Sequence, residues 1–178
     1  MIQQGERGLR QVKRIAVAIA VGAVAGLLLL REYSINPANH SDFGMTWFGA
    51  VALRHGANPY LLIGPGRVFP SEWNLTYPAT AMVVAMPLSF LPEKWASLLF
   101  ISLSSAVLAY LLTNRGWYRL PVFLSAGFIA AARAGQWSPL MTAAWLTPFL
   151  GWAIAAKPNT GTALAVWVAG AKLVHGIG

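Results

Sequence analysis

The sequence contains no cysteine and a single aspartate, Asp42, among its 178 residues. The absence of cysteine excludes disulfides and metal sites built on thiolates. Three histidines and five acidic residues in the whole chain also leave few ligands for a dedicated metal site. We therefore expect no metal ion and no other cofactor.

Charged residues are scarce as well: they make up 10% of the chain, whereas hydrophobic residues make up 57%. A soluble domain typically carries roughly 25% charged residues. A chain with less than half of that share cannot cover a surface that faces water. The composition therefore predicts an integral membrane protein with membrane lipid as its surroundings.

The net charge of +8 comes from 13 lysines and arginines against 5 acidic residues. These cations lie between hydrophobic segments and do not alternate with aromatic residues along one basic stripe, so we expect no nucleic acid partner. Cations that flank membrane helices and face anionic lipid account for the charge.

The hydrophobic pattern predicts an all-α fold, a polytopic transmembrane bundle of about five or six helices within one membrane domain, 1–178. The polar residues 1–14 precede an uncharged run, 15–30. We interpret this run as the first membrane helix, with the basic terminus in the cytoplasm. A signal peptide has the same order of features, but no small-residue cleavage site follows the run. Residues 31–76 then form an extracytoplasmic loop, and the remaining helices lie within 77–175. The expected location is the cell membrane, in a bacterium the inner membrane.

Five hydrophobic segments follow the loop: 77–92, 95–112, 120–134, 140–156 and 160–175. The first is short and contains three prolines, so it either spans the bilayer or dips in and returns. If it returns, Arg115 and Arg119 lie in the cytoplasm, residues 135–136 face the loop side, and Lys157 is cytoplasmic again. We favour this arrangement because it obeys the positive-inside rule better.

Within the loop we expect a short amphipathic helix on the membrane surface, beginning at Ser41 or Asp42 and ending at Gly56. Serine and aspartate are good N-caps, and glycine is favoured just past a helix end. Apolar residues recur at four-residue spacing and form one stripe: Phe43, Trp47 and Val51. Aromatic residues on such a stripe suit the bilayer interface.

Asp42 lies in the first turn of this predicted helix. Its simplest role is to cap the helix by accepting a backbone N–H bond, which contributes about 1 kcal/mol. The positive end of the helix dipole also favours the ionised carboxylate. At the boundary between water and lipid, such a carboxylate could accept a proton from a sugar hydroxyl. The two roles can coexist, because a carboxylate has two oxygens.

Four short motifs in order carry a resemblance to a known family. They are Asp-Phe at 42–43 with Trp47, Ala50 and Gly-Ala-Asn-Pro-Tyr at 56–60; Tyr-Pro at 77–78; Gly-Gln-Trp-Ser at 135–138; and Lys-Pro at 157–158. Together they resemble the glycosyltransferase-C superfamily, most closely glycosyltransferase family 87, the polyprenol-phosphate-mannose-dependent mannosyltransferases. The resemblance covers about residues 35–165. Ser138 stands where the family usually has asparagine. Family members also continue with further helices, so we expect this chain to correspond to their N-terminal half.

The resemblance implies a membrane glycosyltransferase that moves a hexose, expected to be mannose, from a polyprenyl-phosphate donor to an extracytoplasmic glycan or glycolipid acceptor. Asp42 would be the catalytic base of an inverting displacement. A phosphate leaving group needs little help from an acid, so one carboxylate suffices where a glycosidase needs two. The substrate-binding residues would be cations for the donor phosphate and polar groups for the sugar or head group: Arg54, Arg67, Arg133 and Lys157, with Asn58, Tyr60 and Gln136.

Other interpretations remain open. Lys157 could be a cation that extends from a helix end to the interface, and Gln136 a polar contact between helices. A non-catalytic membrane scaffold or subunit with the same fold, or a truncated inactive fragment, fits the same sequence. A small transporter would need paired intramembrane charges or an inverted repeat, and the one candidate charge is Arg133.

Overall fold

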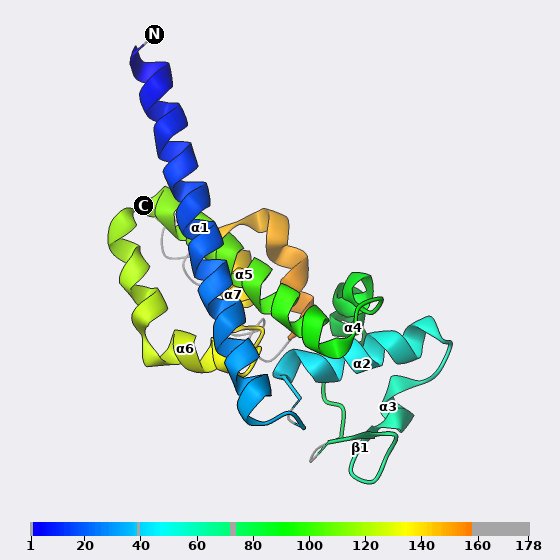
Figure 1. Ribbon diagram of the computed structural model, residues 1–178. Coiled ribbons are helices and arrows are strands. Elements are labelled where there is room, and N and C mark those ends of the chain that lie inside the picture. Colours follow the sequence, from blue (N-terminus) through cyan, green and yellow to red (C-terminus); the bar gives the residue numbers. More distant parts are fainter. Residues whose placement is uncertain (1, 39, 72–73, 158–178) are drawn as a thin grey trace, which may run out of the picture.

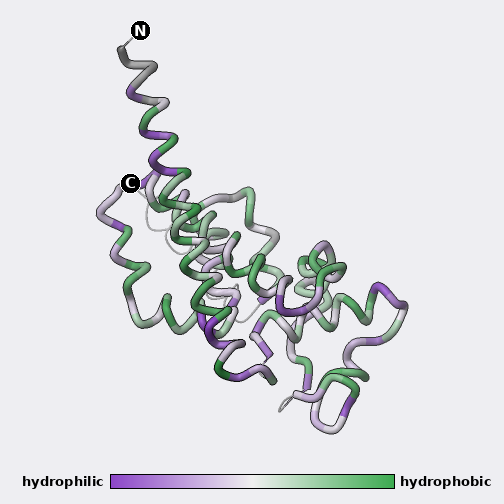
Figure 2. Tube along the Cα trace, viewed as in Figure 1, coloured by the Kyte–Doolittle hydropathy of each residue, from purple (hydrophilic) through white to green (hydrophobic). Residues whose placement is uncertain are grey.

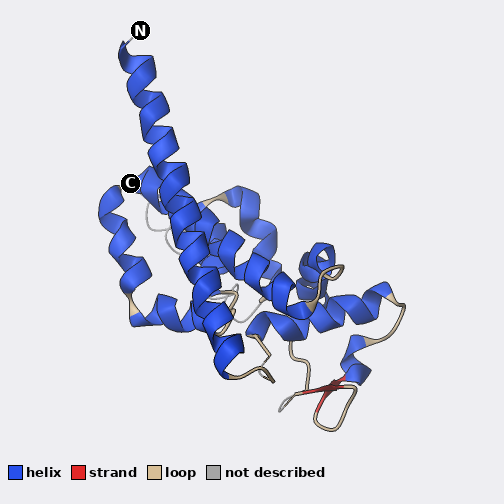
Figure 3. Cartoon of the chain, in the orientation of Figure 1, coloured by secondary structure: helices blue, strands red, loops and turns tan. Residues whose placement is uncertain are grey.

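The computed structural model describes residues 2–38, 40–71 and 74–157 (Figure 1). This part of the chain is mostly helical (Figure 3). Its strands are one short parallel pair, β1 (Ile63–Gly64) and β2 (Phe69–Pro70). The prediction of a helical fold is therefore confirmed for the described residues. The hydrophobic segment expected at 160–175 lies outside the described residues.

Two of the described helices are long and apolar enough to cross a membrane. Helix α1 (Ile2–Ile35) contains one such stretch, Gly8–Ile35. It begins before the uncharged run 15–30, which is by itself too short for a span of about 20 residues. The basic segment that precedes this run holds no proline and joins the helix. Helix α5 (Glu93–Arg115) is the second. It ends at Gly116, whose φ of 141° favours glycine.

Helices α1 and α5 pack against each other in antiparallel directions (Figure 1). Contacts pair early residues of one helix with late residues of the other: Gln11 with Tyr110, and Gly22 with Ser102. Leu29 and Leu98 belong to one buried cluster near the loop end. Figure 2 shows the hydrophobic middle of this pair between more hydrophilic ends. We call the end with residues 10–14 and 113–117 the basic end, and the opposite end, where α1 enters the loop, the loop end.

Short helices fill the loop end and the segment before α5. They are α2 (Asp42–Arg54), α3 (Pro59–Leu62), α4 (Ala79–Ala85) and the 3₁₀ turn η1 (Met86–Leu88). Pro78 precedes α4, Pro87 lies in η1, and Pro92 precedes α5. The segment Ala79–Leu88 is therefore too short to cross a bilayer. The prediction of a short, broken helix over 77–92 is confirmed.

The predictions of one continuous helix at 120–134 and another at 140–156 are wrong. The first segment divides into η2 (Trp117–Leu124) and α6 (Ala126–Arg133), because Ser125 is extended and its hydroxyl caps the new helix. The second divides at extended Thr147 into α7 (Ser138–Leu146) and η3 (Pro148–Ala156), which pack against each other. Each piece is shorter than a membrane span.

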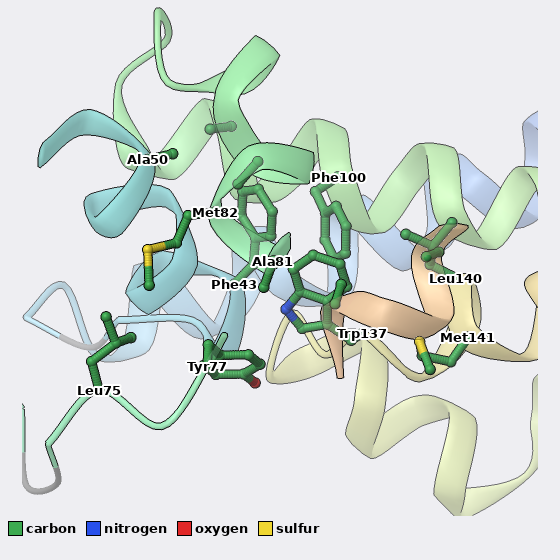
Figure 4. Packing of buried hydrophobic residues seen from close by; sticks show 14 of the residues in the cluster. Phe43, Ala50, Leu75, Tyr77, Ala81, Met82, Phe100, Trp137, Leu140 and Met141 are labelled. Atoms are coloured by element: carbon green, nitrogen blue, oxygen red, sulfur yellow. The ribbon is translucent and has the colours of Figure 1, made fainter. Parts of the chain in front are cut away.

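The main core lies at the loop end, between α2, α4, α5 and α7 (Figure 4). Phe43 stacks on Phe100 with ring centroids 4.1 Å apart, and Trp137 meets Phe100 at 4.9 Å. Phe43 and Trp137 are fully buried. These aromatic rings fix the first turn of α2 against the beginning of α7, and this contact positions the site described below.

The predicted apolar stripe on α2 is only partly correct. Phe43 is buried, but the buried face continues through Thr46 and Ala50, while Trp47 and Val51 are half-buried. The reason is that α2 packs on α4 and α5, and small residues allow this close approach. Trp47 donates from its indole to the carbonyls of Leu88 and Leu91. The apolar residues of α2 therefore pack on protein.

Candidate active site around Asp42

Asp42 begins α2, but Ser41 caps the helix. The Ser41 hydroxyl accepts from the backbone N–H of Gly44 at 3.0 Å. The backbone N–H of Asp42 donates to the carbonyl of Ala134 at 2.8 Å, and that of Phe43 to Gly135 at 3.2 Å. The helix start is thus held by other groups, and the Asp42 carboxylate is left for side-chain partners.

Tyr77 is the first of these partners. Its hydroxyl donates to Oδ1 of Asp42 over 2.7 Å. Burial of the tyrosine, together with the charge and the hydrogen bond of Asp42, raises the pKa of Tyr77 well above its ordinary value. The phenol therefore stays protonated and serves as a fixed donor to the carboxylate.

Lys157 is the second partner. Its Nζ lies 3.4 Å from Oδ2 of Asp42, and both side chains are 29% exposed. The same Nζ lies 5.5 Å from the centre of the Tyr77 ring. Asp42, Tyr77 and Lys157, which we call the Asp42 triad, come from three segments far apart in the sequence.

The position of Lys157 corrects one prediction. We expected Lys157 on the side opposite to the loop, whereas it lies at the loop end beside Asp42. The cause is the break at Thr147, after which η3 returns along α7 toward α4. The hydroxyl of Thr80 donates to the carbonyl of Ala155 at 2.6 Å and fixes the end of η3 there. Gly135 lies on the loop side as expected, since it packs on Ser41.

Gln136 and Arg133 lie near the triad without contacting it. The Gln136 side chain accepts from the Ser138 hydroxyl at 3.3 Å, and its own turn holds the Asp42 backbone. Arg133 binds Glu32 of α1, with Nε and Nη2 each 2.6 Å from Oε1. Its side chain is 48% exposed. The charge of Arg133 is therefore compensated within the fold.

The predicted loop residues have structural partners. Asn58 caps α3 by accepting from the N–H of Tyr60. Tyr60 donates from its hydroxyl to the carbonyl of Tyr77 at 3.0 Å, and so positions the triad through the backbone. Arg54 lies over the Phe90 ring at the far end of α2. Arg67 donates to the carbonyls of Tyr60 and Ile63. Neither arginine is brought to Asp42.

The sequence analysis missed two features of this site. The Tyr-Pro motif includes Tyr77, but it was not predicted as a partner of Asp42, and nothing in the spacing indicates a bond to a residue 35 positions away. Glu93, in the first turn of α5, carries a second carboxylate at this end and pairs with His40 over 2.8 Å. Acidic residues are favoured in the first turn of a helix, a signal that could have identified Glu93 as ordered.

The Asp42 triad can exchange a proton between a partly exposed carboxylate and a hydroxyl group. It also offers one partly exposed cation for an anionic group. No protein-family model, no curated protein and no solved structure matches this chain. Membership of a family therefore stays a prediction that rests on the motifs and on where their residues lie.

Proposed function

We propose that this chain is a membrane glycosyltransferase of the glycosyltransferase-C type, which transfers a hexose from a polyprenyl-phosphate donor to an extracytoplasmic acceptor. The observation that carries the proposal is the convergence of the separate motifs. Asp42, Tyr77 and Lys157 make contacts of 2.7 and 3.4 Å, and the Gly135 turn holds the backbone of the first. In the family that the chain resembles, the sugar is mannose.

In the proposed reaction, the oxygen of an acceptor hydroxyl attacks the anomeric carbon while the bond from that carbon to the phosphate oxygen breaks. The bonding electrons leave with polyprenyl phosphate, and the hydroxyl proton passes to Asp42. Tyr77 holds Oδ1, so Oδ2 is the oxygen that receives the proton. Lys157, which pairs with Oδ2 at rest, turns to the donor phosphate and frees this oxygen.

The orientation of α1 supports a lipid-linked donor. Four cations precede its apolar run, whereas Arg31 alone follows directly. The first helix usually sets the orientation of a membrane protein, with its more basic flank in the cytoplasm. The loop end with Asp42 would then face outward, where nucleotide sugars are not supplied and a lipid carries the sugar.

The test is transfer by the full chain in vesicles that contain a radiolabelled mannosyl polyprenyl phosphate and an alkyl mannoside acceptor. Asp42→Asn keeps the shape of the side chain but removes the base, so transfer should fall by about 100-fold or more. Glu93→Gln is the matched control, since it neutralises a carboxylate at the same end that does not contact Asp42. It should lose far less transfer than Asp42→Asn, because Glu93 pairs with His40 and is not one of the proposed reacting groups. If transfer persists in Asp42→Asn, Asp42 is not the catalytic base.

A non-catalytic scaffold is the second candidate, and one observation favours it: both oxygens of Asp42 already have protein partners. A scaffold predicts that the wild-type chain transfers no sugar in the same assay. It also predicts that Asp42→Asn and Lys157→Gln each lower the unfolding temperature. An active wild-type chain excludes the scaffold.

A further inference from the structure

A polar cavity of about 470 Å³ lies at the basic end, opposite to the Asp42 triad. The beginning of α1 and the end of α5 line it, together with Gly116 and Trp117. Three of the lining residues are arginines: Arg10, Arg14 and Arg115. None of the lining residues is acidic, so the cavity concentrates positive charge.

These charges have no counterion within the described part of the chain. The ion pairs there join other residues: His40 with Glu93, Arg133 with Glu32, and Lys157 with Asp42. Arg115 donates to the carbonyl of Leu146. Arg14 lies over the Tyr110 ring at 4.3 Å and donates to the Gln11 side chain and the Tyr110 carbonyl, each at 3.3 Å. These partners are neutral, so the positive charges at the cavity are not compensated by protein carboxylates, and a bound anion would compensate them.

The cavity lies where the apolar surfaces of both candidate spans stop. The uncharged run of α1 begins at Ile15, directly after Arg14, and the apolar run of α5 ends at Leu112, before Thr113 and Asn114. Trp117, which lines the cavity, is 43% exposed. Aromatic residues at such a border are typical of the head-group level of a bilayer.

An apolar cavity of about 580 Å³ adjoins the polar one between the same two helices and η3. Ile15, Ile19 and Val107 are among its lining residues. Tyr110 connects the two cavities, because it lines the apolar one and its hydroxyl accepts from Gln11 of the polar one. The polar cavity with its arginines suits the anionic head group of a phospholipid, and the adjoining apolar cavity suits its hydrocarbon chain.

We propose that the cavity formed by Arg10, Arg14 and Arg115 binds the phosphate of an anionic phospholipid, with one acyl chain in the adjoining apolar cavity. Basic pockets between membrane helices are known to recognise such head groups. The apolar compartment favours a lipid over a free anion as the occupant. This site lies at the opposite end from Asp42 and does not depend on the transferase proposal.

The experiment is native mass spectrometry of the full chain in detergent, titrated with dioleoyl phosphatidylglycerol or with dioleoyl phosphatidylcholine. The wild-type chain should prefer phosphatidylglycerol. Each arginine near a lipid surface contributes about fivefold in affinity, so the triple variant Arg10→Gln, Arg14→Gln, Arg115→Gln should lose on the order of 100-fold. Arg10→Gln alone, at an exposed residue, tests the same point if the triple variant does not fold.

A matched control removes two cations from the loop end, Arg31→Gln and Lys94→Gln, and is compared with the double variant Arg10→Gln, Arg115→Gln. It changes the net charge by the same amount and should keep the preference. Equal loss in this control, or equal binding of phosphatidylcholine by the wild type, would overturn the proposal. Val107→Trp fills the apolar cavity and should weaken the binding of phosphatidylglycerol although all three arginines are retained. Displacement of the lipid by excess inorganic phosphate would instead identify a simple anion site.

Discussion

The two ends of the α1–α5 pair differ in whether their cations have carboxylate partners within the fold. At the loop end, carboxylates and cations pair within the fold: Asp42 with Lys157, Glu93 with His40, and Glu32 with Arg133. At the basic end, three arginines face a cavity whose lining contains no carboxylate. Charges that pair inside the protein fix its geometry, whereas charges without such partners attract a ligand from outside.

This contrast depends on the antiparallel packing of two uncharged helical segments, which keeps the ends apart. Between Ile15 and Leu30, and again between Trp95 and Leu112, no residue is charged. A charge inside the hydrocarbon region is costly, so the chain places its cations and acids at the ends. The loop end can then build a specific site, while the proposed lipid site would place the basic end at the membrane surface.

The sharpest way to break this comparison is to show that both ends lie on one side of the membrane. Because the chain has no cysteine, single cysteines report position without background. We expect Thr76→Cys and Ala155→Cys, both exposed and at the loop end, to react in intact cells with a maleimide that cannot cross membranes. Asn114→Cys, exposed at the basic end, should react only after lysis, an all-or-none difference.

The cysteine-free chain is the control for this labelling and should not react. Labelling of both Asn114→Cys and Thr76→Cys in intact cells would mean that α5 does not cross the membrane, whereas labelling of Asn114→Cys alone would mean that the orientation is inverted. Labelling of Ala155→Cys only after lysis would show that the end of η3 lies in the cytoplasm. Lys157 would then be on the opposite side of the membrane from Asp42.

The second prediction removes the packing that aligns the two ends. A Cβ at Gly22 would lie 2.6 Å from the backbone carbonyl oxygen of Ser102 and 3.0 Å from Cβ of Ala106. Gly22→Val should therefore force the helices apart, and overpacking of this kind costs about 1–3 kcal/mol. The thermal unfolding midpoint in detergent measures the loss. Gly8→Val is the matched control, because nothing lies within 4 Å of that position, and an unchanged midpoint for both variants would contradict the packing.

Signals local in the sequence predicted the boundaries of several elements. Ser41 caps α2, Gly56 follows its end with a φ of 72°, and prolines separate α4 from α5. Each of these depends on the backbone preferences of a few neighbouring residues. The long apolar run of α5 needed no tertiary information either.

Features that depend on distant contacts were predicted poorly. The break at Thr147 turned an expected span into the pair α7 and η3 and brought Lys157 to the loop end. Hydropathy does not distinguish one long helix from two short ones of equal apolar content. The motifs named Asp42 and Lys157 as site residues, but their contact over 115 positions arises only from this reversal.

The smallest predicted effect concerns the hydrogen bond inside the Asp42 triad. Tyr77→Phe removes a hydrogen bond to the Asp42 carboxylate and should lower the free energy of unfolding by about 1–2 kcal/mol near neutral pH.

The pKa of Tyr77 is raised in the folded protein by burial and by Asp42, whereas an unfolded tyrosine ionises at about pH 10. Above that pH the folded state holds a proton that the unfolded state has lost, so the wild-type stability decreases as the pH rises. The advantage of the wild type over Tyr77→Phe should therefore shrink between about pH 9 and pH 11, as measured by chemical unfolding. Tyr118→Phe, at an exposed ring, serves as the control and should not change this pH dependence, and a constant gap for Tyr77→Phe would show that the buried phenol is not held by the carboxylate.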